Sequence, residues 1–300
     1  MPPSAQTDDR TAAATLKAPK TILMATDLSA RSDRALERAV TLAKQHQARL
    51  VILNIIDEDL PSSVQDRVRD ATLTEIQNSL DRVDGAEALD PSVEAIAGKD
   101  YRDILDHADA IAADLIVLGI HRNEAGNKPI AGTTMERVIR KGQKPVLVVP
   151  NRTEGTYNKV AVAVDFSAYS RIAIRQALTL APGAEFNAIH SYHVPFGGFQ
   201  RGRETRNAYR DEHERTLTQL IEEELETLIG SASQPDIPFH KVIKQGETQS
   251  VIRSEVERLQ PDLLVLGTHG RVGLTHALLG SIAESFLNNP PCDVLVVKAW

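Results

Sequence analysis

The sequence predicts an α/β protein made of two tandem open five-stranded parallel sheets, each with helices on both faces in a Rossmann-like arrangement. The chain of 300 residues is long enough for two domains, and its 42% hydrophobic and 25% charged residues are typical of a globular protein. Short continuous apolar runs alternate with longer segments of helical period, which is the pattern of strand-helix-strand units around a parallel sheet buried on both faces. This pattern occurs twice along the chain.

The two halves of the chain repeat one another. Segment 22–29, ILMATDLS, is echoed by 160–167, VAVAVDFS, and segment 114–121, DLIVLGIH, is echoed by 262–269, DLLVLGTH. The first pair is displaced by 138 positions and the second by 148, so the second copy holds ten extra residues, which we place in the Gly- and Arg-rich stretch 195–206. Such a repeat predicts two copies of one domain.

The predicted boundaries are a disordered tail over 1–19, a first domain over 20–152 and a second domain over 153–300. In the first copy the apolar runs predict strands at 21–26, 49–55, 92–97, 114–119 and 145–149. The helix after the first strand has an i, i+3, i+4, i+7 apolar stripe formed by Leu36, Ala39, Val40 and Ala43. We expect this stripe to pack on the sheet.

The second copy repeats this order. Its apolar runs predict strands at 159–164, 185–191, 239–243, 263–267 and 293–297. A long charged helix, about 204–228, separates the second and third of these strands, and its acidic run 222–226 is expected to face solvent. A junction over 150–157, which contains proline and glycine, links the halves.

A glycine-rich loop in the second half points to a binding site. Open parallel sheets bind ligands beyond the carboxyl ends of their strands, so the residues just after each strand are the ones of interest. The fourth strand ends in 267–271, GTHGR; nine residues, 271–279, separate Gly270 from the dipeptide Gly280-Ser281, which opens a predicted helix. Glycines let the backbone turn sharply and approach a ligand, and a helix N-terminus offers free N–H groups to an anion.

This Gly-x2-Gly-x9-Gly-Ser pattern resembles the nucleotide-binding signature of ATP-binding universal stress proteins. The resemblance covers nearly the whole chain beyond the tail, and it implies a stress-response protein of regulatory or protective role that binds ATP, with or without Mg or Mn, across the strand ends. The positions that match in the second half are Asp165 and Ser191 near adenine and ribose, Gly267, His269, Gly270 and Arg271 near the phosphates, and Gly280, Ser281 and Ile282 as N–H donors.

The first half matches the same pattern with one departure. Its matching positions are Thr26, Asp27, Ile55, Gly119, His121, Gly132 and Thr133. Arg122 stands where the second half has Gly270. The arginine would either fill the phosphate volume and abolish triphosphate binding or pair with a phosphate, and the sequence leaves both open.

The resemblance also implies how the halves associate. Single-domain relatives pair as dimers, often through their last strands, so we expect the apolar segments Val146–Val149 and Val294–Val297 to join the halves as an internal pseudo-dimer. A homodimer of the whole chain and the identity of protein partners stay open.

Other interpretations of these residues stay open too. Asp27 and Asp165 also suit helix caps, since aspartate at a strand-to-helix turn accepts from free N–H groups. The sequence has no Gly-x-Ser-x-Gly elbow, no Walker A loop and no Gly-x-Gly-x-x-Gly motif, so binding is favoured over turnover. The alternatives are slow ATP hydrolysis or autophosphorylation at Ser281, and a nucleotide-free interaction module that uses the Arg-rich loop.

Composition excludes several classes. The net charge of −7 argues against a nucleic-acid-binding protein, and the longest apolar runs fall short of the roughly 20 residues that span a bilayer. The single cysteine, Cys292, cannot form an intramolecular disulfide. We therefore expect a cytoplasmic protein that has no structural metal and binds no membrane.

Overall fold

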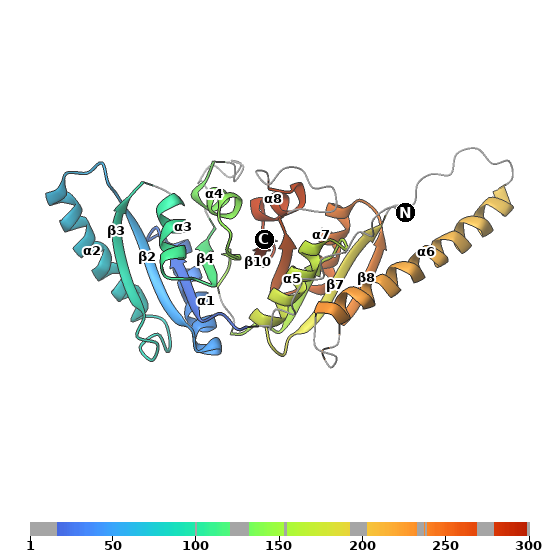
Figure 1. Cartoon of the computed structure of the whole chain (residues 1–300), viewed down its shortest axis with the longest axis horizontal. Coiled ribbons are helices and arrows are strands. Elements are labelled where there is room, and N and C mark those ends of the chain that lie inside the picture. Colours follow the sequence, from blue (N-terminus) through green and yellow to red (C-terminus); the bar gives the residue numbers. More distant parts are fainter. Residues whose placement is uncertain are drawn as a thin grey trace, which may run out of the picture.

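The computed structural model describes residues 17–99, 101–120, 132–152, 155–192, 203–232, 237, 239–268 and 279–298. In this part of the chain, helices and strands alternate in the predicted order and form one elongated α/β body (Figure 1). No helix in these ranges is both long and apolar enough to cross a bilayer.

The first half contains five strands and four helices in its described part. They are β1 (Thr21–Ala25), α1 (Ala30–His46), β2 (Arg49–Asp57), α2 (Ser62–Leu80), β3 (Ser92–Gly98), α3 (Tyr101–Ala110), β4 (Leu115–Gly119), α4 (Thr134–Lys141) and β5 (Val146–Val149). Strand β2 runs two residues further than predicted, to Asp57, because β3 stays paired with it as far as Gly98.

The second half follows the same plan. Its elements are β6 (Lys159–Ala163), α5 (Ala168–Leu180), β7 (Glu185–Tyr192), α6 (Arg203–Ala232), β8 (Phe239–Gln245), α7 (Thr248–Leu259), β9 (Leu263–Gly267), α8 (Ser281–Asn288) and β10 (Asp293–Val297). The long helix α6 has 30 residues, and its N-terminal part extends away from the rest of the body (Figure 1).

All ten strands belong to one sheet, in the order β3-β2-β1-β4-β5-β10-β9-β6-β7-β8. Among the described strands, pairing is parallel within each half, as predicted, and antiparallel only between β5 and β10. The expected contact between the last strands is therefore present, and it merges the two five-stranded sheets into one. Leu295 lies opposite Leu147 at the centre of this pairing.

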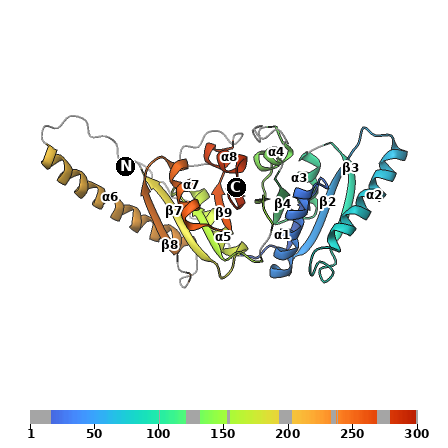
Figure 2. The ribbon, with the colours of Figure 1, turned by 180° about the vertical axis from the view of Figure 1, so that it is seen from behind.

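Helices cover both faces of the sheet and create two apolar cores. Residues of α1, α2, α5 and α6 form the core on one face, and residues of α3, α4, α7 and α8 form the core on the other. The predicted stripe of α1 is buried in the first core, which confirms its orientation. Figure 2 shows the same arrangement of helices and strands from behind.

The start of α1 follows from local chemistry. Ser29 has an extended backbone, and its side chain accepts a hydrogen bond from the N–H of Ser32, which is an N-cap. Ser167 caps α5 in the same way through the N–H of Ser170. The repeat therefore extends to the capping residues, which fix where each helix leaves the strand before it.

We predict that Leu295→Ala lowers the free energy of unfolding by about 3 kcal/mol, because the substitution leaves a cavity where the two halves meet. Urea unfolding followed by circular dichroism measures this loss. Leu220→Ala is the matched control, since Leu220 on α6 is 58% exposed and its truncation is expected to change the free energy by about 0.5 kcal/mol or less. Equal losses in the two variants would contradict the prediction.

Candidate functional site

A cleft of about 730 Å³ opens in the second half at the carboxyl ends of β6, β7 and β9, next to the N-terminus of α8. Six of the residues predicted from the sequence line it: Asp165, Ser191, Gly267, Gly280, Ser281 and Ile282. The predicted residues His269, Gly270 and Arg271 lie outside the described part of the chain. Sequence positions from 165 to 282 thus converge on one cavity.

Asp165 organises the turn between β6 and α5. Its Oδ1 accepts hydrogen bonds from the N–H of Ser167 at 3.1 Å, from the Ser167 hydroxyl at 2.6 Å and from the Ser170 hydroxyl at 2.7 Å. The next residue, Phe166, has a left-handed backbone with φ of 64°. A non-glycine residue rarely adopts this conformation, so the aspartate-serine network compensates for local strain.

The first half repeats this turn in detail. Asp27 Oδ1 accepts from the N–H of Ser29 at 3.0 Å and from the Ser32 hydroxyl, and Leu28 has φ of 62°. Burial alone would raise the pKa of Asp27, but the hydrogen bonds from Ser29 and Ser32 outweigh it and lower that pKa. The N-caps are therefore Ser29 and Ser167, and not the aspartates that the sequence offered for that role. Asp27 and Asp165 stabilise the turn just before each cap, and Asp165 also lines the cleft.

The carboxyl ends of the first two strands in each half are tied together by a side chain. The Nδ1 atom of His190 lies 2.7 Å from the carbonyl oxygen of Val164, and the imidazole is 4.5 Å from the ring of Phe166. In the first half, the side-chain amide of Asn54 donates to the carbonyl of Thr26 at 2.9 Å. These contacts hold the strand ends at fixed spacing around the site.

The helix that borders the site begins differently in the two halves. Thr133 is the N-cap of α4, and its hydroxyl accepts from the N–H of Glu136 at 3.1 Å. In the second half Gly280 is the N-cap of α8, with no side-chain hydrogen bond, and Ser281 already belongs to the helix. Since Ser281 is the repeat equivalent of Thr133, α8 begins one position earlier. Its first N–H groups are not capped by a side chain at Gly280.

Acidic residues surround the cleft. Asp165, Glu247 and Glu284 line it, and none of its described lining residues is Lys or Arg. Glu247 accepts from the N–H of Ser250 at 2.7 Å and of Gln249 at 3.0 Å, and these hydrogen bonds lower its pKa. A polyanionic ligand would therefore need positive charge from another source.

The predicted residues of the first half are distributed differently from those of the second half, six of which line one cleft. Asp27 lies in the turn after β1, and Gly119 is the last residue of β4. A Cβ added at Gly119 would lie 3.0 Å from the carbonyl oxygen of Arg31. Ile55 is partly buried against the core that contains α3 and α4. Gly132 has φ of 83°, a conformation that favours glycine. His121 and Arg122 fall outside the described residues.

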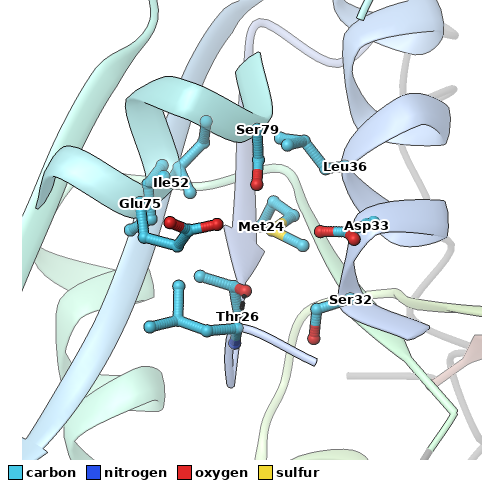
Figure 3. A pocket seen from close by; sticks show the side chains of 10 residues that line it. Met24, Thr26, Ser32, Asp33, Leu36, Ile52, Glu75 and Ser79 are labelled. Carbon is cyan, nitrogen blue, oxygen red and sulfur yellow. Dashed lines mark hydrogen bonds between the residues drawn. The ribbon is translucent and has the colours of Figure 1, made fainter. Parts of the chain in front are cut away.

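Thr26 lines a small pocket on the opposite face of the sheet, between α1 and α2. In Figure 3 the carboxylates of Glu75 and Asp33 lie on two sides of Met24, with Thr26 and Ser32 at one end and Ser79 at the other. Because Met24 belongs to the core that contains α1 and α2, this pocket is not the counterpart of the second-half cleft. Val164, the repeat equivalent of Thr26, lines the second-half cleft, so the assignment of Thr26 to a first-half nucleotide site stays a prediction.

Comparison with known proteins decides the family. The profile described as "Universal stress protein family" matches residues 19–150 and again 156–298. The chain belongs to the universal stress protein family.

Full-length relatives have the same tandem arrangement. A universal stress protein from Mycolicibacterium smegmatis is 24% identical over 295 residues, covering 92% of this chain and 96% of that protein. A solved universal stress protein from Archaeoglobus fulgidus has a TM-score of 0.64 at 22% identity and covers 93% of this chain and 98% of its own. A structure of a protein of unknown function from Pseudomonas aeruginosa has the same TM-score and identity, with 94% of each chain covered. These structures support the fold.

The sequence did not predict several residues of this universal stress protein's cleft. Tyr169, Glu247, Thr248 and Thr268 line it but were not predicted. The Thr248 hydroxyl accepts from the Ser191 hydroxyl at 2.8 Å. A signal was available, because Gly246-Glu247-Thr248 follows β8 at the same carboxyl edge and repeats the position of 98–100 after β3. The predicted residues follow only the first, second and fourth strands or open the last helix of each half.

We predict that Asp27→Asn lowers the free energy of unfolding at pH 7 by about 1–2 kcal/mol, because it removes a charged acceptor from the turn. Since the folded-state pKa of Asp27 is lowered, its stabilisation is present above the unfolded pKa and is lost as pH falls through the folded pKa. The gap to the unaltered protein should close below about pH 4. Urea titrations from pH 3 to 8 measure it.

The control for this experiment is Glu87→Gln, a change at an exposed carboxylate. It is expected to alter the free energy of unfolding by about 0.5 kcal/mol or less across the range. A deficit in Asp27→Asn that stays constant from pH 3 to 8 would show that the carboxylate charge is not what stabilises the turn.

Proposed function

We propose that this universal stress protein binds ATP in the second-half cleft and acts through occupancy of that site rather than through rapid turnover. The observation that carries the proposal is the position of the uncapped N-terminus of α8 in the wall of the cleft, beside the glycine motif. Such a terminus favours phosphate groups through its N–H donors and its dipole. The proposed role in the cell is regulatory or protective.

The remainder of the cleft suits a nucleoside. Its volume of about 730 Å³ lies within the usual range for small-ligand sites. Ile189, Ile252 and Leu266 provide apolar wall, and Asp165, Ser191 and Thr248 add polar groups. This combination supports a heterocyclic base packed on apolar side chains, with ribose hydroxyls directed to the polar groups.

The charge of the cleft favours a nucleotide that enters with a divalent cation. Three carboxylates line the described wall, whereas the sequence places the basic residue Arg271 in the glycine loop. When bound, Mg or Mn would neutralise phosphate charge. Glu284, in the first turn of α8, lines the cleft beside the proposed phosphate site and is the carboxylate that we propose to face such a cation.

The first half is proposed to bind nucleotide more weakly. The Thr133 hydroxyl already accepts the N–H of Glu136, so one of the donors available for phosphate is occupied in α4. Arg122, which replaces glycine in the loop motif, acts in the same direction if its side chain fills the phosphate volume. In this proposal the second half holds the nucleotide site, and the first half is its structural partner.

One observation favours a second candidate function, slow autophosphorylation. Ser281 and Glu284 line the same cleft and are separated by three positions on α8, so both side chains lie on one face of the helix. A serine hydroxyl beside a carboxylate that accepts its proton is a minimal arrangement for transfer of the γ-phosphoryl group to Ser281 Oγ, with ADP as leaving group.

We predict that Gly280→Val weakens ATP binding about tenfold or more, because a branched side chain at the N-cap blocks the approach of phosphate to the first N–H groups of α8. Gly132→Val should leave the affinity unchanged, although it strains a position with φ of 83°. Calorimetric titration with ATP and Mg on the unaltered chain and both variants measures this. Equal affinity in all three proteins would reject the assigned site.

Ser281→Ala separates binding from phosphoryl transfer. If occupancy is the function, this variant binds ATP within about threefold of the unaltered protein, because the N–H groups of α8 remain. Incubation with γ-labelled ATP followed by mass analysis should then find no phosphate on either protein. Stoichiometric label on the unaltered chain that is absent from Ser281→Ala would establish the alternative instead.

A further inference from the structure

A buried ion-pair cluster joins the two halves beneath the β5–β10 pairing. Arg38 Nε on α1 donates to Asp293 Oδ2 at 2.7 Å, and the Tyr157 hydroxyl donates to the same oxygen at 2.7 Å. The Arg38 guanidinium also lies 4.2 Å from the centre of the Tyr157 ring and donates to the carbonyl of Gly155 at 2.6 Å. The Arg38 and Asp293 side chains are 7% and 5% exposed.

Every member of this cluster is supported by the others. Burial raises the pKa of Asp293, and the Arg38 guanidinium and the Tyr157 hydroxyl oppose that effect. The Tyr157 hydroxyl keeps its proton because burial and the neighbouring carboxylate raise its pKa. Removing one partner of such a buried pair is costly, since it leaves a charge without compensation away from water.

The repeat does not reproduce this cluster. The spacing of 138 that relates the first strands places Gln176 at the position of Arg38 and Pro19 at the position of Tyr157. The spacing of 148 that relates the last strands places Pro145 at the position of Asp293. The pseudo-symmetric location therefore has neither the cation nor the carboxylate, although the backbone pairing around Leu147 and Leu295 is symmetric.

This asymmetry discriminates between possible pairings of halves. Two second halves that paired through β10 would each bury Asp293 opposite Gln176, without a cation. Two first halves that paired through β5 would each bury Arg38 opposite Pro145, without a carboxylate. Only a first half against a second half compensates the charges.

A second contact across the same junction is equally one-sided. The Lys298 ammonium donates to the carbonyl oxygens of Arg140 and Gly142, each at 2.7 Å, at the end of α4. At the spacing of 148 the first half has Pro150, which carries no donor. A pair of first halves would therefore leave these α4 carbonyls without this donor.

We propose that the Arg38–Asp293–Tyr157 cluster selects the partner of each terminal strand, so that a second half accepts a first half and rejects a second copy of itself. The occupant of the β10 edge is thus specified by charge, and the apolar strand pairing supplies affinity without selectivity. This inference does not depend on nucleotide binding.

The test starts from the folded full-length chain, which is then cut between its two halves. A protease site is inserted between 152 and 155, the folded protein is nicked, and labelled and unlabelled nicked samples are mixed in increasing urea until the labels exchange. Native mass spectrometry then counts pairs of like and unlike halves. Unlike pairs are expected to exceed like pairs by about 100-fold or more. A statistical mixture of like and unlike pairs would overturn the proposal.

A gain-of-function variant gives a sharper test of the same selectivity. Gln176→Arg supplies the missing cation to the second half, so pairs of two second halves are expected in the nicked variant and not in the nicked parent. Arg38→Met/Asp293→Asn removes both charges and should shift the nicked protein toward the statistical mixture. If Gln176→Arg forms no more like pairs than the parent, or the double variant remains as selective, the cluster does not choose the partner.

The control for substitution as such is Arg69→Met/Asp66→Asn. This pair has the same residue types in an i, i+3 bridge on α2, in which Arg69 Nη1 lies 2.8 Å from Asp66 Oδ1 and the side chains are 36% and 71% exposed. Its nicked form should retain the selectivity of the parent. Loss of selectivity in this control would also count against the proposal.

Discussion

The antiparallel pairing of β5 with β10 is the contact on which the arrangement of this protein depends. Each half by itself would end in an apolar strand with one unpaired edge, which is a site for indiscriminate association. Joined, the two strands become the interior of a ten-stranded sheet, and all their residues are buried. The helices of both halves then meet across this seam, so its register sets the relative position of everything else.

The second constraint is the turn after the first strand of each half. Four features recur there: three consecutive residues, namely an aspartate, a left-handed residue and an N-cap serine, and a second serine three positions later. Strain in the left-handed residue is offset by hydrogen bonds to the aspartate, which gives a rigid corner at the carboxyl edge of the sheet. In the second half that corner forms one wall of the cleft.

Much of the fold was predictable from the sequence, because repeated apolar runs and the offsets of 138 and 148 define the strands and their order along the chain. Of the six predicted residues that line the cleft of the second half, Gly267, Gly280, Ser281 and Ile282 belong to or adjoin the glycine motif, which has a local pattern. Asp165 and Ser191 lie far from that motif in the sequence and were implied by the family resemblance. The one-position shift between Thr133 and Gly280 as N-caps was not, because both dipeptides suit a helix start. The pairing of Arg38 with Asp293 spans 255 positions and has no motif, so only the three-dimensional structure reveals it.

The outer ends of the sheet determine how far it can grow. With β5 and β10 used internally, the open edges are β3 and β8. Strand β8 exposes His240, Lys241 and Lys244, and charged residues of this kind discourage the addition of another strand. The two apolar edge strands of the halves therefore pair with each other inside one chain, and the charged residues of β8 oppose further growth of the sheet at that edge.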